Sequence, residues 1–421
     1  MLHISIFARM VNAMFRKMMG LPCCLIFLSH LQAQELKPGF DKEEYVALMK
    51  VSAQFGDTGY ASGFAPPEGY RLLYRSPVMG LENRWDLWQT DRGVPVLSIR
   101  GTTKKEISWL ANFYAAMVPA KGQLHLTEGE LFRYTLAENP QAAVHTGWLI
   151  ATGFLAKDML PKIDSFYRKG NKQCYIMGHS QGGAIAYLLT AYLAHLQKEG
   201  KLPADLRLKT YCSAAPKPGN LYFAYEYEAL TQEGWAYNVV NALDWVPQSP
   251  FSVQTVDDFV SINPFTNARP VIRKSPIPKR WVLSYAYGRL SKPAEKARKN
   301  YRRFLGKYVA KSIKKALPGF KEPAYYNSSD YVRAGNIIAL VPRQDYYQKF
   351  PQAPEKTFAN HLHGAYLYLV NQIGMQNRET DSLHGSWELT HIGDKEATAL
   401  YPEKRPLLRF EGTSGKMSGT T

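Results

Sequence analysis

Cysteine is scarce in this chain, with four in 421 residues. Cys23 and Cys24 lie near the N-terminus, whereas Cys174 and Cys212 fall in apolar segments that we expect to be core strands. Two isolated thiols in such strands favour free, buried cysteines over a disulfide. The sequence has no CxxC pair and no cluster of His and Cys, so it indicates no metal site.

Long apolar runs are also missing. The run over residues 18–31 follows several basic residues, and it is too short and too interrupted for a comfortable transmembrane helix. We interpret residues 1–33 as a signal peptide that is cleaved near Ala33, which predicts a secreted or envelope protein. Cys23 and Cys24 leave a lipoprotein anchor open as an alternative, and an uncleaved segment would give a membrane-anchored form.

Acidic residues are almost absent from one segment. Between Arg269 and Lys321 there are 17 Lys and Arg residues but only one acid, Glu295, so this segment carries +16 of the formal net charge of +17. The basic character therefore belongs to one part of the chain, and the rest is close to neutral.

Low-complexity tracts and internal repeats are absent, and 45% hydrophobic with 21% charged residues is typical of a globular protein. After an initial hairpin, expected strands alternate with expected helices, which predicts an α/β fold with one mostly parallel sheet and helices on both faces. We expect one domain over residues 34–405 and a C-terminal tail over 406–421. The expected strands are 71–74, 85–90, 94–100, 174–177, 208–213, 237–242 and 336–341, and the expected helices include 41–55, 104–117, 146–167, 221–230 and 361–373.

The most informative stretch is residues 173–195, which read QCYIMGHSQGGAIAYLLTAYLAH. An apolar strand runs into GHSQG, and an alanine-rich helix follows at once, as in the nucleophile elbow G-x-S-x-G. Gly178 and Gly182 stand where strand and helix backbones nearly touch. The turn holds the hydroxyl of Ser180 above the sheet, so Ser180 is the candidate nucleophile.

A serine nucleophile needs a base and an acid that orients the base, in the order Ser, acid, His in such folds. Asp244 ends an expected strand at the carboxyl edge of the sheet, although an Asp in an ordinary turn is the alternative. His361 lies at a loop-to-helix junction, and His363 is its competitor. His384 and His391 fall in a polar region and are interpreted as surface residues.

The tetrahedral intermediate needs two N–H donors near the serine. The backbone of Gln181 supplies one by its place in the elbow. The turn IRGTT over residues 99–103 offers the other, because Gly101 allows close approach and Thr102 carries both an N–H and a hydroxyl.

Together these stretches resemble the fungal-type, class 3 lipase family of α/β-hydrolases over about residues 95–370. The resemblance implies the α/β-hydrolase fold, the triad Ser180, Asp244 and His361, an oxyanion hole at Thr102 and Gln181, and no cofactor. The matching stretches, in family order, are SIRGTT at 98–103 with WL at 109–110, VHTGW at 144–148, GHSQGGA at 178–184, PKPGN at 216–220, NALDWVP at 241–247, and His361 five residues before Tyr366.

The resemblance also implies a lid, here about residues 110–142. We expect residues 119–140 to be irregular, and several apolar residues in this region could cover an acyl groove. These residues are Phe113, Tyr114, Met117, Val118 and Leu124.

A basic insert at about residues 266–325 departs from the family pattern. We expect a helix from Ser291 to Leu317, stopped by the Pro and Gly that follow, with cations around one apolar face. Two interpretations stay open: a helix packed on the domain with its charges in water, or a helix on an anionic membrane surface. Binding of nucleic acid by this helix is disfavoured, because its aromatic residues lie on the apolar face and not among the cations. The expected face consists of Tyr301, Phe304, Leu305, Tyr308, Val309, Ile313, Ala316 and Leu317.

The sequence therefore predicts a serine ester hydrolase that acts on acylglycerols or phospholipids through an acyl-enzyme. The alternative is a non-catalytic lipid-surface binding protein that retains the fold. An intact triad argues against the alternative.

Overall fold

The computed structural model describes residues 36–56, 63–265 and 267–373, together with five short strands between residues 385 and 420. The predicted signal peptide, residues 1–33, lies outside the described residues. Within the described ranges, no helix combines the length and the apolar character that crossing a membrane requires.

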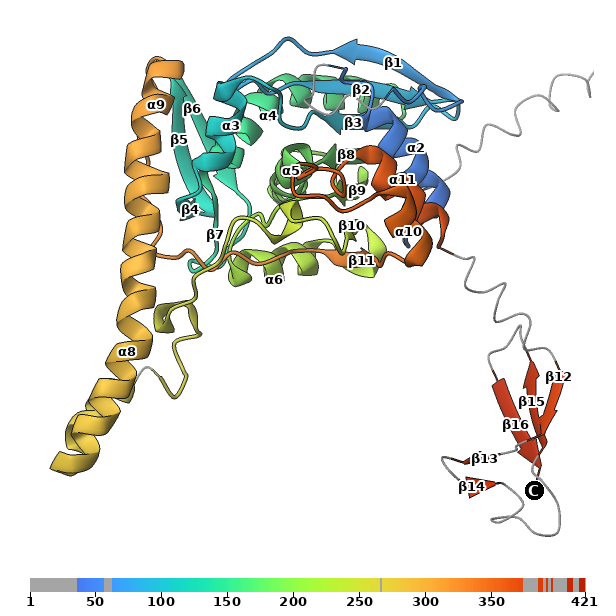
Figure 1. Cartoon of the computed structure of the whole chain (residues 1–421). Coiled ribbons are helices and arrows are strands. Elements are labelled where there is room, and N and C mark those ends of the chain that lie inside the picture. Colours follow the sequence, from blue (N-terminus) through green and yellow to red (C-terminus); the bar gives the residue numbers. More distant parts are fainter. Residues whose placement is uncertain are drawn as a thin grey trace, which may run out of the picture.

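A seven-stranded sheet forms the centre of the molecule (Figure 1). The first three strands pair antiparallel, and each later neighbour pairs parallel, which confirms the expected hairpin followed by a parallel sheet. In spatial order the strands are β1 (Tyr70–Arg75), β2 (Trp85–Thr90), β3 (Pro95–Ile99), β8 (Gln173–His179), β9 (Arg207–Ser213), β10 (Ala236–Asn241) and β11 (Asn336–Leu340).

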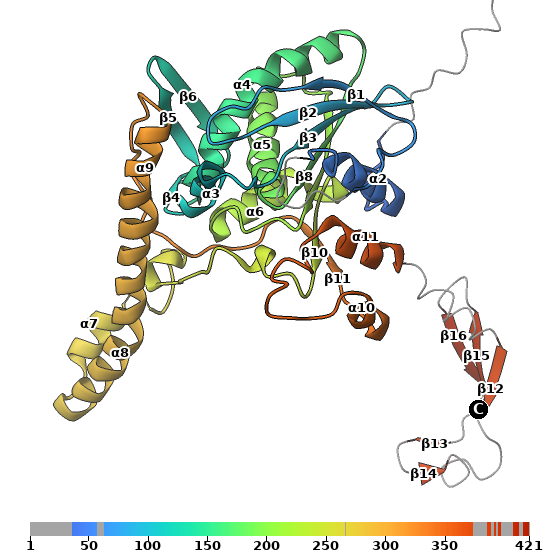
Figure 2. The ribbon, with the colours of Figure 1, turned by 45° about the horizontal axis from the view of Figure 1, so that its top comes forward.

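Helices cover both faces of this sheet, as the alternation along β8 shows. Cys174 and Ile176 belong to the apolar cluster on one face, and Tyr175 and Met177 to the cluster on the other. Cys174 and Cys212 are buried free thiols, as expected. The first face carries α4 (Thr146–Arg168), α5 (Gln181–Lys198) and α6 (Leu221–Leu230), and the second carries α2 (Lys42–Ser52) and α11 (His363–Asn371) (Figure 2). This is the predicted α/β-hydrolase fold.

Short elements connect the larger ones. They are α3 (Glu106–Phe113), β4 (Met117–Pro119), β5 (Lys121–Thr127), β6 (Glu130–Thr135), β7 (Ala143–His145), η1 (Gln232–Gly234), η2 (Val246–Gln248), η3 (Val256–Asp258) and α10 (Gln344–Lys349).

The prediction of irregular structure over residues 119–140 is wrong. Strands β5 and β6 form an antiparallel hairpin, and Leu124, Leu126 and Phe132 enter the main core. Apolar residues at alternate positions explain this, because they turn one face of each strand inward. Of the five residues proposed as a lid, only Phe113 is exposed, and the other four are buried. The segment 110–142 is therefore packed structure rather than a loose cover.

The basic insert forms a long helical rod along one side of the molecule (Figure 1). The helix begins at Ile277 rather than at the predicted Ser291, and it passes through Pro293 without ending. Its end at Ala316, before Pro318, agrees with the prediction. The elements are α7 (Ala268–Lys274), α8 (Ile277–Arg302), the π-helical turn η4 (Arg303–Tyr308) and α9 (Val309–Ala316).

The π turn changes which residues face the domain. Tyr301 and Gly306 are both buried, five positions apart, so the inward face shifts by one residue there. The turn also leaves the carbonyl oxygen of Leu305 to accept a hydrogen bond of 3.0 Å from the backbone N–H of Ala116. The predicted apolar face is therefore right for Tyr301, Ile313 and Leu317, which are buried, and wrong for Phe304 and Tyr308, which are exposed.

The last described strands pair among themselves. Strand β12 pairs antiparallel with β15, and β15 with β16, so the boundary predicted at residue 405 falls inside one small sheet. The strands are β12 (Gly385–Glu388), β13 (His391–Ile392), β14 (Lys395–Glu396), β15 (Leu407–Glu411) and β16 (Lys416–Thr420).

Candidate active site

Ser180 stands at a strained turn between β8 and α5. Its φ of 61° and ψ of −130° lie in a region that residues with a side chain rarely adopt. The flanking glycines are required: a Cβ on Gly178 would lie 2.1 Å from the carbonyl oxygen of Gly182, and one on Gly182 would lie 2.2 Å from that of Ile99. The local structure is therefore the predicted elbow.

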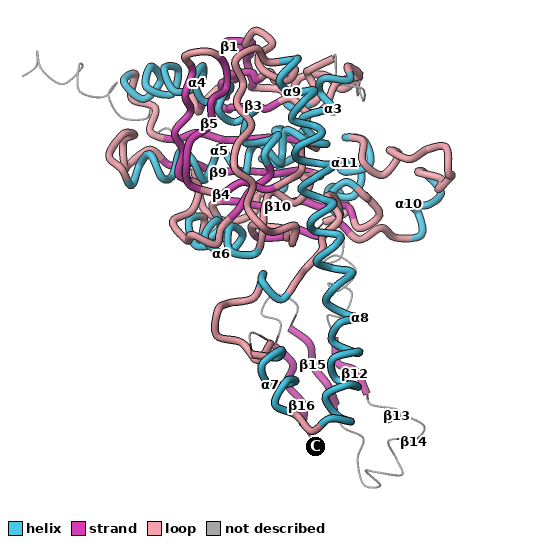
Figure 3. Tube along the Cα trace, turned by 90° about the vertical axis from the view of Figure 1, so that its left-hand side faces the viewer, coloured by secondary structure: helices cyan, strands magenta, loops and turns pink. Residues whose placement is uncertain are grey.

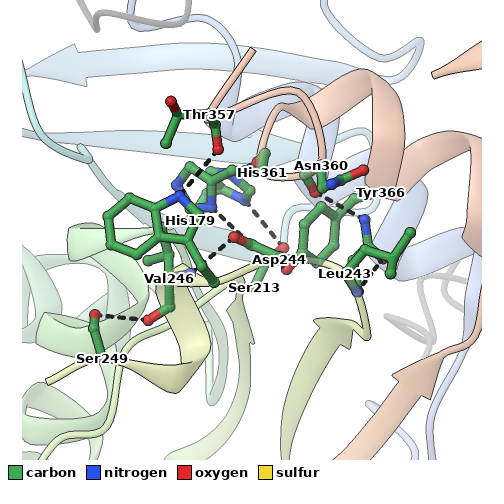
Figure 4. Close-up of polar contacts among 12 residues, drawn as sticks. His179, Ser213, Leu243, Asp244, Val246, Ser249, Thr357, Asn360, His361 and Tyr366 are labelled. Carbon is green, nitrogen blue, oxygen red and sulfur yellow. Dashed lines mark hydrogen bonds and ion pairs between the residues drawn. The ribbon is translucent and has the colours of Figure 1, made fainter. Parts of the chain in front are cut away.

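Asp244 and His361 meet in the structure, although they are 117 residues apart in the chain. The imidazole Nδ1 of His361 lies 2.7 Å from Oδ2 of Asp244, and both side chains are buried (Figure 4). The same Oδ2 accepts a hydrogen bond of 2.8 Å from the hydroxyl of Tyr366, and Oδ1 accepts one of 2.9 Å from the backbone N–H of Val246. A carboxylate held by three donors keeps the proton of His361 on Nδ1, which leaves Nε2 as the basic nitrogen.

The loop before His361 is fixed from the sheet. Asn241, the last residue of β10, donates through its side-chain amide to the carbonyl oxygen of Asn360 at 2.8 Å and to the hydroxyl of Tyr346 at 3.0 Å. The hydroxyl of Tyr346 in turn donates to the side chain of Asn360 at 2.7 Å. The strand that leads to the acid thus also positions the loop that carries the base.

His363, the alternative base, faces another part of the molecule. Its Nε2 lies 2.9 Å from Oγ of Ser52 on α2, and Ser52 donates to the carbonyl oxygen of Met49. Burial, together with the neighbouring His361, lowers the pKa of His363 to about 3, so the ring is neutral at ordinary pH. The geometry favours His361 over His363.

Sequence reasoning missed a further histidine of the site, His179, which is the variable residue before the serine in G-x-S-x-G. Its ring is buried and lies between the rings of His361 and His363, at centroid distances of 4.9 and 4.2 Å. Burial, and secondarily its histidine neighbours, hold its pKa well below the ordinary value. The signal available in the sequence was the polar residue His179 at the end of an otherwise apolar strand.

The predicted oxyanion residues also come together. Gln181 is the first residue of α5, where backbone N–H groups have no partner within the helix. A Cβ on Gly101 would lie 3.1 Å from the carbonyl oxygen of His179, so the turn after β3 passes directly beside the elbow. The hydroxyl of Thr102 accepts a hydrogen bond of 3.0 Å from Asn112, which fixes this side chain at the serine.

Residues 96–254 match the family model described as lipase (class 3). The match confirms the expected resemblance to this family over these residues. The expected class of enzyme, a carboxylic ester hydrolase, is confirmed with it. The match covers the elbow and Asp244 and ends before the basic insert and before His361, so the role of His361 rests on the geometry described above.

Solved structures of fungal lipases are similar to parts of the chain. Triacylglyceride lipase from Rhizomucor miehei is 20% identical, with 51% of this chain and 77% of that chain covered and a TM-score of 0.38. Lipase II from Rhizopus niveus is 20% identical, with 50% and 74% covered and a TM-score of 0.36. Likeness at this level adds nothing to the fold described above. None of the curated proteins matches the chain.

The protein has a cavity of about 560 Å³ at the serine. Apolar and aromatic side chains dominate its lining, and they come from α3, the loop after Asp244, and the loop before His361. The basic insert contributes as well, through Tyr301 and Leu305. The lining includes Thr102, Trp109, Phe113, Trp148, Ser180, Gln181, Trp245, Phe251 and Phe358.

Proposed function

We propose that this lipase hydrolyses ester bonds of acylglycerols or phospholipids, with Ser180 as nucleophile, His361 as base and Asp244 as the acid that orients it. The observation that carries the proposal is the buried contact of 2.7 Å between His361 and Asp244, beside a serine held in a strained elbow. An apolar cavity of about 560 Å³ opens at that serine, and it suits an acyl chain.

The chemistry follows from the positions of these groups. The hydroxyl of Ser180 attacks the ester carbonyl carbon while Nε2 of His361 takes the hydroxyl proton. The backbone N–H groups of Gln181 and Thr102 stabilise the negative oxygen that forms. The ester C–O bond breaks, His361 returns the proton to the leaving alcohol, and an acyl-enzyme remains. Water, activated by the same histidine, then releases the fatty acid and restores Ser180.

The proposal includes a place of action and a surface. The basic residues before the apolar run in residues 1–33 support a location outside the cytoplasm, secreted or in the cell envelope. An anionic membrane surface stays proposed as a partner of the basic helix, residues 291–317. The contact would be electrostatic over the second half of that segment, because Ala310, Ile313 and Leu317 are buried against the domain.

The competing function is a lipid-surface binding protein without turnover. A binding protein has no use for strain at Ser180 or for a buried carboxylate that two other donors orient toward a histidine. Both features cost stability, and both are needed for nucleophilic catalysis.

The decisive experiment compares Ser180→Ala with a matched control, Ser284→Ala, at an exposed serine of α8. Substrates are p-nitrophenyl esters of graded acyl length and a phospholipid panel. We expect Ser180→Ala to lower kcat on the order of 10⁶-fold, as for nucleophile loss in serine proteases, and the control to be unchanged. A fluorophosphonate probe should label the wild type and not Ser180→Ala. Full activity in Ser180→Ala would show that Ser180 is not the nucleophile, and no hydrolysis of any ester by the wild type would favour the binding protein instead.

A further inference from the structure

The first half of the basic insert projects away from the domain. Residues 259–294, here called the arm, comprise a loop, helix α7 and most of α8, and Figures 1 and 3 show them extending beyond the body of the molecule. Helix α7 lies along α8 (Figure 2). An ion pair of 3.0 Å between Arg269 and Glu295 joins the two helices. The arm is thus a helical pair rather than a loose loop.

Large apolar side chains on the arm are unusually exposed. Trp281 is 70% exposed and Tyr285 is also 70% exposed, and with Ile277 they lie four residues apart on one face of α8. In the second half of the same rod, by contrast, Tyr301, Ala310 and Ile313 are buried against the domain. An exposed apolar patch of this kind marks an interaction site. The other exposed apolar residues of the arm include Val260, Ile262, Phe265, Val271, Val282 and Leu290.

The charge of the arm is of one sign. Residues 259–294 contain seven Lys and Arg residues and no Asp or Glu. Cations interleaved with Trp and Tyr at exposed positions match a helix that lies in the headgroup layer of an anionic bilayer. The basic residues are Arg269, Arg273, Lys274, Lys279, Arg280, Arg289 and Lys292.

Helix α8 connects the arm to the cavity at Ser180. At its base, the buried guanidinium of Arg298 contacts the carboxylate of Asp257 at 2.8 Å and the hydroxyl of Thr255 at 2.7 Å. One turn further, Tyr301 enters the cavity wall, and its ring lies 6.0 Å from that of Phe251, a cavity residue that is 74% exposed. One continuous helix therefore links the exposed residues of the arm to the wall of the cavity.

We propose that the arm docks this protein on anionic lipid bilayers, with Trp281 and Tyr285 in the headgroup layer and the basic residues on the lipid phosphates. Two observations support docking on the bilayer, namely the exposed apolar side chains of the arm and its positive charge. That the bilayer also holds the substrate rests on the proposed function. Most of the arm precedes the basic helix proposed at residues 291–317, and from Tyr301 onward the apolar face of that helix is covered by the domain.

The test is co-sedimentation of the full chain with vesicles of phosphatidylcholine alone or with 30% phosphatidylglycerol, at low and high salt. One variant removes the aromatic contact, Trp281→Ser with Tyr285→Ser. Its matched control is Tyr225→Ser, because Tyr225 is an exposed aromatic residue on α6 of the body. A second variant carries Lys279→Gln, Arg280→Gln and Arg289→Gln. Its matched control carries Lys307→Gln, Lys311→Gln and Lys315→Gln, which removes the same charge from the packed half of the rod.

We expect binding to phosphatidylglycerol vesicles that weakens at high salt, and about a hundredfold loss on removal of three arm cations. The aromatic variant should also lose binding, Tyr225→Ser should bind like the wild type, and the charge control should lose clearly less binding than the arm charge variant. Equal losses in the two charge variants, or wild-type binding by the aromatic variant, would overturn the arm as the docking element. Self-association or RNA binding that the arm variants abolish, without lipid binding, would overturn the lipid as its occupant.

Hydrolysis of a soluble short-chain ester separates this proposal from the proposed function. Trp281 and Tyr285 do not line the cavity, so both arm variants should keep wild-type rates on that ester and lose activity only on vesicle-borne lipid. If no ester is hydrolysed by any form, the proposed function fails, whereas the vesicle assay still decides on docking.

Discussion

The ring of His179 holds the main chain of His361: its Nε2 donates a hydrogen bond of 2.9 Å to the carbonyl oxygen of His361. Nδ1 of His179 lies 3.1 Å from Oγ of Ser213, and that hydroxyl lies 2.7 Å from the hydroxyl of Tyr45 on α2. Because Ser180 follows His179 directly, one buried ring couples the position of the candidate nucleophile to that of the candidate base.

Replacing His179 should therefore lower turnover rather than substrate binding. We expect His179→Ala to reduce kcat about ten- to a hundredfold with little change in KM, the scale of one lost buried hydrogen bond of about 1–3 kcal/mol. Ser213→Ala, which removes only the more distant bond, should have a smaller effect. Steady-state kinetics on a soluble p-nitrophenyl ester measure both. An unchanged kcat in a folded His179→Ala protein would show that the hydrogen bond is only structural.

Substitutions of His361 and His363 should have clearly different effects on activity and on stability. His361→Ala should be nearly as damaging as loss of Ser180, because triad members act as a unit. His363→Ala should keep most of the activity and lose stability instead, since it removes a buried contact with Ser52. Kinetics and urea unfolding on both variants give the comparison. The reverse pattern would move the role of base to His363.

The wall formed by the basic insert should determine acyl length. Leu305 is partly buried and lines the cavity, so Leu305→Trp fills space that a long acyl chain would occupy. We expect hydrolysis of long-chain esters to fall about tenfold or more while short-chain esters react as before, on the scale of about 1–3 kcal/mol per methylene in a pocket. Phe304→Trp, on the exposed side of the rod, is the control. A uniform change across chain lengths would contradict the assignment.

The sequence predicted the elbow and the order of strands well because both depend on local constraints. Only glycine fits at positions 178 and 182, and the alternation of strand and helix leaves few arrangements of the sheet. Asp244 and His361 could be chosen by the same logic, because catalytic groups gather at the carboxyl edge of a parallel sheet. Their catalytic roles stay predictions.

Other features depended on partners that no local pattern reveals. The π turn at 303–308 lies where the carbonyl oxygen of Leu305 accepts a hydrogen bond from the backbone N–H of Ala116. Regular helical periodicity, which does not include this contact, would place Phe304 on the inner face, whereas it is exposed. The role of His179 likewise requires His361, 182 residues away. The hairpin of β5 and β6 is a different case, because the alternation at Leu124 and Leu126 is itself a local pattern that favours a strand.

Buried neutral histidines should make this protein sensitive to acid. Burial lowers the pKa of His145 and of His363 to about 3, whereas both rings have an ordinary pKa of 6.5 when the chain unfolds. The unfolded state therefore binds more protons below pH 6.5. Stability from these groups is complete above that pH and falls steadily as the pH drops toward 3. At pH 5 each histidine costs about 2 kcal/mol of folding free energy relative to neutral pH.

The measurement is urea unfolding of the wild type and of His363→Asn at pH 7 and at pH 5. Other groups titrate over this range in both proteins, so the informative quantity is the difference between their losses. The variant should start less stable at pH 7, because Ser52 loses its partner, yet it should lose about 2 kcal/mol less than the wild type on acidification. Equal losses would mean that His363 is not held neutral in the folded protein.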